Sequence, residues 1–257
     1  MAIQWSLVIF TLLTGCAGWM FACLAVDEFI KKVPTKAFKV ALCGIVIMAA
    51  GGIASVTHLS HPENMLAALG HPTSGIFTEA VLVGLSAACA IVYLILLKRS
   101  ASDGARKAFV ILAAAFGVAL SFSAGASYMM SSHPAWNTIA LPLGYLGTAA
   151  PLGIAAFLCL AGTEAREPYA LFGAVAGFAG ALLALLCVMS SGIDALGIIC
   201  FLGDLVAGAC LLVASRKADF MMPAGIVALA AVVVAGLMFR CLMWVTAVPI
   251  DNFFQML

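Results

Sequence analysis

The sequence predicts an all-α integral membrane protein, a bundle of eight transmembrane helices with both termini on the extracytoplasmic side. Three observations predict this fold class: an apolar composition, eight long apolar segments, and basic residues confined to alternate loops. Of the 257 residues, 65% are hydrophobic and only 9% are charged. Soluble domains carry about 25% charged residues, so this chain cannot cover a water-facing surface. Its net charge of +1 gives no reason to expect nucleic-acid binding.

Each of the eight apolar segments is long enough to cross a bilayer as a helix, which needs about 20 residues. The chain has room for these spans and for short loops, so we expect residues 1–257 to form a single transmembrane domain. The first apolar run has no basic region before it and is too long for a cleavable signal, so we expect it to be retained. The predicted spans are approximately 3–26, 39–59, 75–97, 108–130, 138–161, 170–190, 195–214 and 222–247.

The loops predict the orientation of the spans. Eleven of the twelve Lys and Arg residues fall in or beside alternate connectors, and the intervening loops of 60–74, 131–137 and 191–194 hold none. Basic loops face the cytoplasm, so both termini and the neutral loops are expected outside. The eleven residues are Lys31, Lys32, Lys36, Lys39, Lys98, Arg99, Arg106, Lys107, Arg166, Arg216 and Lys217.

Cysteines and glycines within the spans are expected to serve packing. The nine cysteines are scattered through apolar segments without a CxxC pair, whereas zinc and iron–sulfur sites need clustered thiolates. Small residues at helical spacing, such as Gly173, Gly177 and Gly180, allow helices to approach closely. We therefore expect a tightly packed bundle.

All four histidines lie at or near the predicted outer face. His58 ends the second span, and a histidine there can exchange a proton at neutral pH; its alternative role is an interfacial hydrogen bond. His61, Glu63 and His71 are expected to be solvated or to contact a partner. The segment HPENMLAAL around them is apolar enough at helical spacing to form a short interfacial helix.

Glu79 lies about one turn into the third span. A carboxylate at this depth is costly and usually faces a cavity or a partner, and desolvation favours its protonated form. The alternative explanation is the favourable position of an acidic residue near a helix N-terminus. Both explanations can hold together.

A second outer cluster, YMMSSHPAWN, contains Tyr128, His133 and Trp136. Interfacial Trp and Tyr residues are expected as membrane anchors, and Tyr128 with His133 could instead line a pocket beside His58. A bis-histidine haem needs facing ligands from two helices, and His58 with His133 is the only pair that could supply them. Because no span centre contains a histidine, we expect no haem and no metal site in this chain.

Two charged residues lie deep within the last two spans. Arg240 occurs in FRCLMW of the eighth span and Asp204 in FLGDLVAG of the seventh. Intramembrane charges usually pair with one another or mark a functional route. Arg240 is expected to pair with Asp204 or Glu79, and Asp204 with Arg240 forms either a structural pair or part of a proton route.

The chain resembles the membrane anchor subunits of dimethyl sulfoxide reductases, the DmsC family. GGIASVTHLSHPENMLAALG with SGIFTEAVLVG is similar to the family's His-Leu-Gly-x-Pro … Ser-x-x-Glu element. YMMSSHPAWN with PLGYLGTAAPLG resembles its Tyr … Pro-x-Trp … Gly-x-x-x-x-x-Pro-x-Gly element. LVIFTLLTGCAGWMFAC and MFRCLMW resemble its first and last helices. The likeness covers nearly the whole chain.

The resemblance implies an eight-helix anchor that oxidises menaquinol to menaquinone and carries no haem or iron–sulfur cluster of its own. It implies an iron–sulfur electron-transfer subunit and a molybdopterin catalytic subunit as partners on the extracytoplasmic face. Carried over by position, His58 is the quinol-site histidine and Glu79 its acidic partner. Tyr128, Trp136 and Arg240 are expected to complete the quinol site.

The main hypothesis is thus the quinol-oxidising anchor of an anaerobic respiratory complex in a bacterial or archaeal cytoplasmic membrane. A first rival is a polysulfide-reductase-type anchor that translocates protons through Asp204, Arg240 and Glu79. A second rival is a secondary transporter, which should display inverted repeats and broken helices.

Overall fold

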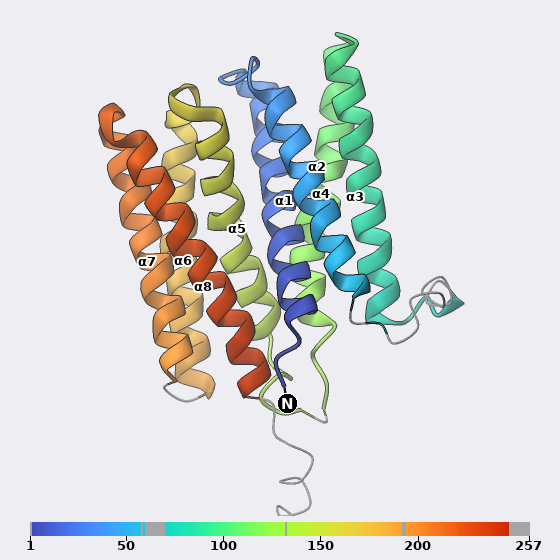
Figure 1. Cartoon of the computed structure of the whole chain (residues 1–257), viewed down its shortest axis with the longest axis vertical. Helices are drawn as coiled ribbons and strands as arrows, with labels where there is room; N and C mark the ends of the chain where they lie inside the picture. Colours follow the sequence, from blue (N-terminus) through green and yellow to red (C-terminus); the bar gives the residue numbers. More distant parts are fainter. Residues whose placement is uncertain (1, 58, 60–69, 132, 192–193, 247–257) are drawn as a thin grey trace, which may run out of the picture.

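The computed structural model describes residues 2–57, 59, 70–131, 133–191 and 194–246 of the chain. The described residues form α-helices and two short 3₁₀-helices, with no β-strand among them (Figure 1). The helices are α1 (Trp5–Ile30), α2 (Ala37–Val56), α3 (Gly75–Lys98), α4 (Asp103–Ala126), α5 (Ala140–Ala161), η2 (Gly162–Ala165), α6 (Arg166–Ser191), α7 (Ala195–Arg216), η3 (Ala218–Phe220) and α8 (Met221–Val245).

Seven helical stretches in the described residues are long and apolar enough to cross a membrane. One of them, Ala140–Leu186, contains both α5 and α6. The chain turns back within it, at Gly162 with its positive φ of 71° and at the extended residue Glu167. As a result α5 and α6 pack side by side (Figure 1). The all-helical character of the prediction is confirmed.

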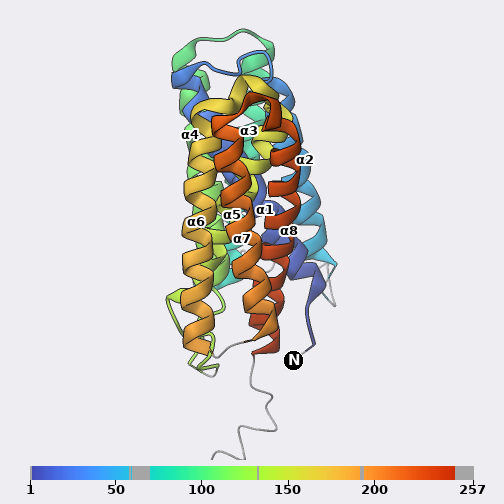
Figure 2. The same ribbon diagram turned by 90° about the vertical axis from the view of Figure 1, so that its left-hand side faces the viewer.

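The helices form two neighbouring groups of four. In the first group α1 packs on α2 and α4, and α3 packs on α2 and α4. In the second group α5 packs on α6 and α8, and α7 packs on α6 and α8. Figure 2 looks onto the α6, α7 and α8 side of the second group. The groups join where α5 meets α1 and α4, so α1 and α5 hold the centre of the bundle.

The two ends of the bundle differ in charge. The turns that follow α1, α3, α5 and α7 lie together at one end, the upper end in Figure 1. These turns and their flanks carry eleven of the twelve basic residues, and we call this the basic end. The start of α1 and the end of α8 lie at the opposite end with the 131–137 loop, which we call the neutral end.

The first helix continues past its predicted limit. Its predicted span ends at Val26, whereas α1 runs to Ile30 and includes the buried carboxylates of Asp27 and Glu28. Asp27 accepts hydrogen bonds from the backbone of the following turn and from Tyr169 of α6 at 3.0 Å. Glu28 accepts one from Tyr93 of α3 at 2.9 Å and pairs with the ammonium group of Lys31. These partners allow two acidic residues to remain inside the helix, because each buried carboxylate is hydrogen-bonded.

Glycine contacts confirm the expected tight packing. A methyl group on Gly18 of α1 would come within 2.6 Å of the Gly117 backbone in α4. One on Gly177 of α6 would come within 2.7 Å of the Gly208 backbone in α7. At these crossings two helix backbones touch, as small-residue spacing predicts.

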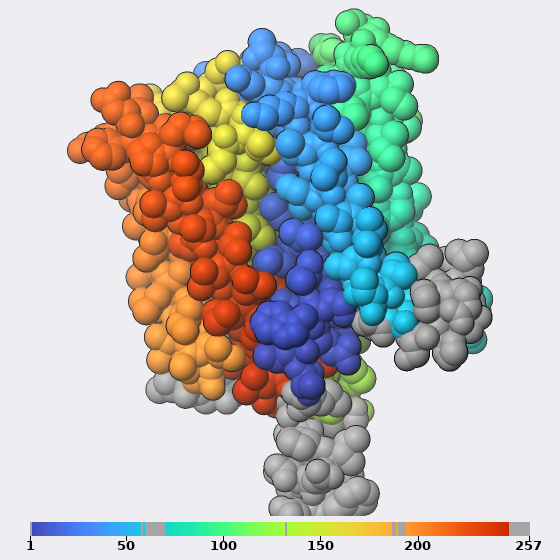
Figure 3. Space-filling view, viewed as in Figure 1, coloured from blue at the N-terminus to red at the C-terminus, as the bar shows by residue number. Residues whose placement is uncertain are grey.

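Bulky apolar side chains cover the outside of the bundle. Figure 3 views one face, on which α8, α1 and α2 are visible together. Many of the exposed residues are Leu, Ile, Val and Phe, with Ile53 at 68% and Val175 at 61% exposure. Such a surface suits lipid and not water.

Candidate functional site

Glu79 lies at the neutral end, in the second turn of α3, and is half-buried. Ser74 caps this helix by accepting a hydrogen bond from the backbone N–H of Phe77 at 3.1 Å. The hydroxyl group of Ser127, just beyond the end of α4, donates to Glu79 Oε1 at 2.6 Å. The approach is close because a methyl group on Gly75 would come within 2.6 Å of Ser127 Cβ. The structure therefore gives Glu79 a defined orientation at the junction of α3 and α4.

Tyr128 directly follows Ser127, the residue that donates a hydrogen bond to Glu79, and its ring belongs to a group of aromatic side chains. Its ring lies 6.3 Å from that of Tyr145 in a stacked arrangement. It also meets the rings of Trp136 at 6.0 Å and Trp244 at 5.9 Å, edge to face. Such arrangements are favourable for aromatic pairs. We call Tyr128, Trp136, Tyr145 and Trp244 the aromatic cluster.

Trp136 fixes the loop between α4 and α5 onto the last turn of α8. Its indole is only 2% exposed, and Nε1 donates to the backbone oxygen of Met243 at 2.7 Å. The hydroxyl group of Tyr145 donates to the sulfur of the same methionine at 3.3 Å. Because the indole N–H is already engaged, Trp136 can shape a neighbouring pocket but has no free donor for a ligand.

Arg240 is buried, with 1% exposure, and lies next to Tyr145 of the aromatic cluster. Its guanidinium donates from Nε to Thr11 Oγ1 at 2.8 Å, from Nη2 to the Thr11 backbone oxygen at 3.1 Å, and from Nη1 to Thr148 Oγ1 at 3.2 Å. A further bond from Nη1 reaches the backbone oxygen of Gly236 at 2.9 Å, and the group sits 4.8 Å from the centre of the Tyr145 ring. The charge is thus held by neutral oxygen atoms and an aromatic face.

Asp204 makes no hydrogen bond or ion pair with Arg240, although pairing was one expectation. It is fully buried in α7, and neither carboxyl oxygen has a hydrogen-bond partner among the described residues. The two groups still lie close enough to interact electrostatically. Four of the five guanidinium N–H groups instead donate to Thr11, Thr148 and Gly236. Arg240 makes no ion pair with Glu79 either, within the part of the chain that the structure describes.

Of the four histidines, His71 and His133 lie among the described residues. His58, His61 and the neighbouring Glu63 lie outside the described residues, as does most of the segment expected to form an interfacial helix. His71 is exposed in the turn before α3. His133 packs on Trp136 with ring centres 4.6 Å apart, and its buried Nδ1 has no hydrogen-bond partner among the described residues.

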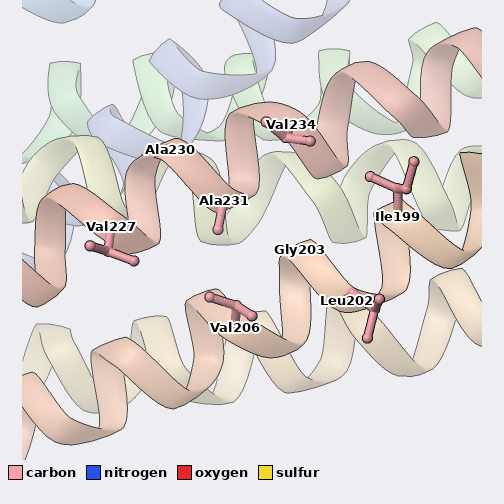
Figure 4. Close-up of a pocket in the computed structure, with 8 residues that line it drawn as sticks. All are labelled: Ile199, Leu202, Gly203, Val206, Val227, Ala230, Ala231 and Val234. Carbon is pink, nitrogen blue, oxygen red and sulfur yellow. The ribbon is translucent and has the colours of Figure 1, made fainter.

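An apolar groove of about 430 Å³ lies on the outer surface between α7 and α8 (Figure 4). It contains no side chain that could exchange a proton. Its lining consists of Ile199, Leu202, Gly203, Val206, Val227, Ala230, Ala231 and Val234. The groove faces the surroundings of the bundle, so it is a lipid-facing feature and we do not place chemistry there.

The structure therefore brings four of the predicted residues together at the neutral end: Glu79, Tyr128, Trp136 and Arg240. The Glu79 carboxyl interacts electrostatically with the phenol groups of both Tyr128 and Tyr145. A half-buried carboxyl beside aromatic rings and apolar lipid-facing helices can accept a proton from an apolar ligand that enters from the bilayer. Among the residues that the structure describes, no three or more His, Cys, Asp or Glu side chains lie together in a group that could hold a metal ion.

Sequence reasoning missed several residues of this arrangement. Ser127, Tyr145 and Met243 lie within or beside apolar segments, where nothing in their local pattern distinguishes them from packing residues. Trp244 closes the FRCLMW segment that contains Arg240, and the sequence gives it no separate role.

The chain matches a known protein family. The model of a protein family described as DMSO reductase anchor subunit (DmsC) matches residues 1–245. The match includes every residue of the site described above. No curated protein matches the chain.

Proposed function

The chain belongs to the DMSO reductase anchor subunit family, and from this premise we propose that it oxidises menaquinol at its neutral end. Family membership and the seven apolar helical stretches make it a multi-pass membrane anchor subunit of DMSO-reductase-type complexes. Such an anchor associates with catalytic oxidoreductase subunits. The proposal adds the substrate, the site and the route of protons and electrons.

In the proposed reaction one menaquinol loses two protons and two electrons and becomes menaquinone. The quinol head group enters from the bilayer beside α3 and hydrogen-bonds to His58, which takes the first proton. Glu79 orients the imidazole of His58 or takes the second proton, and both protons leave on the outer side. The electrons pass to an iron–sulfur subunit docked at the neutral end and from there to a molybdopterin catalytic subunit.

The observation that carries this proposal is the placement of Glu79. Its carboxyl is half-buried, is held by Ser127 at 2.6 Å and neighbours the aromatic cluster. A proton acceptor must lie within hydrogen-bond reach of the group that it deprotonates, and its side chain must be held in place. The aromatic rings offer an apolar wall for the flat quinone ring.

We further propose the finer topology on which this reaction depends. All eight helices α1 to α8 cross a bacterial or archaeal cytoplasmic membrane, and the basic end faces the cytoplasm. Both termini and the site are then extracytoplasmic. Protons released by the quinol and protons consumed by a partner on the same side cancel, so the cycle conserves little or no proton-motive force.

The test replaces Glu79 or His58 by Gln in the membrane-bound complex. We expect Glu79→Gln and His58→Gln each to lower menaquinol-dependent electron delivery to the partner by about 100-fold or more, as loss of a general base does. The matched control is Glu164→Gln, which makes the same change at the exposed basic end, where Glu164 accepts a hydrogen bond from Thr35. Retained quinol oxidation in either variant, with partners still bound, contradicts the assignment.

A second candidate function is a polysulfide-reductase-type anchor coupled to proton translocation. One observation favours it: Asp204 and Arg240 are both buried in membrane-spanning helices. Proton uptake from the basic-end side during turnover is the measurement that separates this candidate from the first.

A further inference from the structure

Asp204 is a buried acid that the proposed quinol chemistry does not use. It lies in the interior of the second four-helix group, on the opposite side of α7 from the groove-lining residues around Gly203. Both carboxyl oxygens lack a hydrogen-bond partner among the described residues. A buried polar group of this kind costs about 1–3 kcal/mol when it stays unsatisfied, so its persistence needs an explanation.

Gly180 of α6 lies beside both the Asp204 carboxyl and the backbone carbonyl oxygen of Gly147 in α5. A Cβ atom on Gly180 would lie 3.0 Å from Asp204 Oδ2 and 2.9 Å from the carbonyl oxygen of Gly147 in α5. The two oxygen atoms are therefore no farther apart than the sum of these distances. Glycine at this position lets both groups approach the same point from two helices.

The carbonyl of Gly147 lacks its usual donor within α5. In an α-helix it would accept a hydrogen bond from the backbone nitrogen of residue 151. That residue is Pro151, which lies inside α5 and has no N–H group. In membrane helices, carbonyl groups freed by proline are satisfied by neighbouring groups or by ordered water.

Burial without a hydrogen-bonded partner argues that the Asp204 carboxyl is neutral, because desolvation disfavours the charged form. Arg240 of α8 interacts with it electrostatically and favours the ionised form, but four of the five guanidinium N–H groups already donate to Thr11, Thr148 and Gly236. The titratable groups of α6 whose side chains are described lie at the Arg166 end. A bare carboxylate without a hydrogen-bonded partner in this interior costs several kcal/mol, whereas a protonated acid can donate a hydrogen bond.

We propose that Asp204 and the Gly147 carbonyl form a proton-binding site in which protonated Asp204 donates to a buried water molecule that bridges to Gly147. Hydrogen bonds of about 2.8 Å on either side of one water can join two oxygen atoms whose separation lies within the upper bound that the Gly180 distances give. Buried waters typically have two to four polar partners, and this water has the acid and the carbonyl. The inference does not rest on quinol oxidation, because it concerns a resting state of the second four-helix group.

Infrared difference spectroscopy on the purified complex, without turnover, tests the protonation. The wild-type spectrum minus that of Asp204→Asn is expected to contain the carbonyl band of a protonated carboxylic acid at pH 7, shifted to lower frequency in D₂O. Asp204→Asn keeps the shape of the side chain. Glu79→Gln is the matched control: the Asp204 band is common to wild type and Glu79→Gln and is expected to cancel from their difference spectrum. If the Asp204→Asn difference contains carboxylate bands instead, the site is ionised and the proposal is overturned.

Two further variants test the bridging water. Pro151→Ala restores an N–H donor to the Gly147 carbonyl, and Gly180→Ala places a methyl group between the two oxygens. In both we expect the acid band to move to the higher frequency of a less hydrogen-bonded group. An unmoved band in folded Pro151→Ala protein overturns the bridge, whatever the fate of Gly180→Ala.

Discussion

Arg240 is stabilised by groups that carry no formal charge. The expected partner was an acid in a neighbouring span, because intramembrane charges usually pair. The actual partners are Thr11 and Thr148, which lie 229 and 92 residues away along the chain. The sequence suggests that a threonine in an apolar span is a packing residue, because its hydroxyl group can hydrogen-bond to a backbone oxygen of its own helix. The position of the arginine could thus be predicted from the sequence, but its partners could not.

The geometry at Arg240 predicts that lysine cannot replace it. Lysine has a single ammonium group in place of the planar fork that reaches Thr11 and Thr148 together. Arg240→Lys should lower the stability of the detergent-solubilised protein by about 2 kcal/mol, in the range of a lost hydrogen bond to a charged group. Thermal unfolding measures the change. Arg216→Lys, at an exposed position of the basic end, is the control, and equal stability of the two variants would contradict the role of the fork.

The residues of the neutral-end site differ in whether the sequence alone distinguishes them from packing residues. Glu79 and Arg240 are conspicuous because charges are rare in apolar spans, and Tyr128 and Trp136 because aromatic residues mark an interface. Ser127 carries no such signal, yet it holds Glu79 at 2.6 Å. A contact between the ends of α3 and α4 depends on their relative packing, which local sequence does not encode.

At the scale of elements, the end of α1 differs from the limit of the predicted span for a physical reason. The span prediction stopped before Asp27 because acids are costly in a bilayer. In the structure α1 continues, since Tyr169, Tyr93 and the turn after Ile30 satisfy the two carboxylates. Apolar length predicts where a helix can lie in lipid, whereas its end depends on tertiary partners.

The crossing of α1 and α4 predicts a strong position dependence of glycine substitutions. A methyl group on Gly18 would meet the Gly117 backbone at 2.6 Å, whereas one on Gly52 of α2 meets nothing within 4 Å. Gly18→Ala should separate the helices and destabilise the protein by about 1–3 kcal/mol, as overpacking does. Gly52→Ala should be neutral or stabilising by up to about 1 kcal/mol, the helix preference for alanine. Thermal unfolding of both variants in the same detergent measures the two changes in stability. An unchanged stability of Gly18→Ala would contradict the close contact between the α1 and α4 backbones.

At the scale of the whole molecule, the basic and neutral ends predict a fixed orientation in the membrane. Ala135 lies exposed in the loop between α4 and α5, and Ser102 lies exposed in the turn before α4. In intact cells a membrane-impermeant thiol reagent should label Ala135→Cys and should label Ser102→Cys only after lysis. The unmodified chain gives the background, because its described cysteines are buried or half-buried within helices. The reverse labelling pattern would invert the orientation and move the proposed quinol site to the cytoplasmic side.

The contacts of Arg240 also have a consequence for biogenesis. Without α8, Thr11 and Thr148 still donate to backbone oxygens of their own helices, so the earlier helices are complete as they leave the ribosome. Without α1 and α5, α8 would bring an uncompensated cation into lipid. The dependence therefore runs in one direction: α8 is synthesised after α1 and α5 and needs the threonine oxygens of both, so its stable insertion follows the assembly of those two helices.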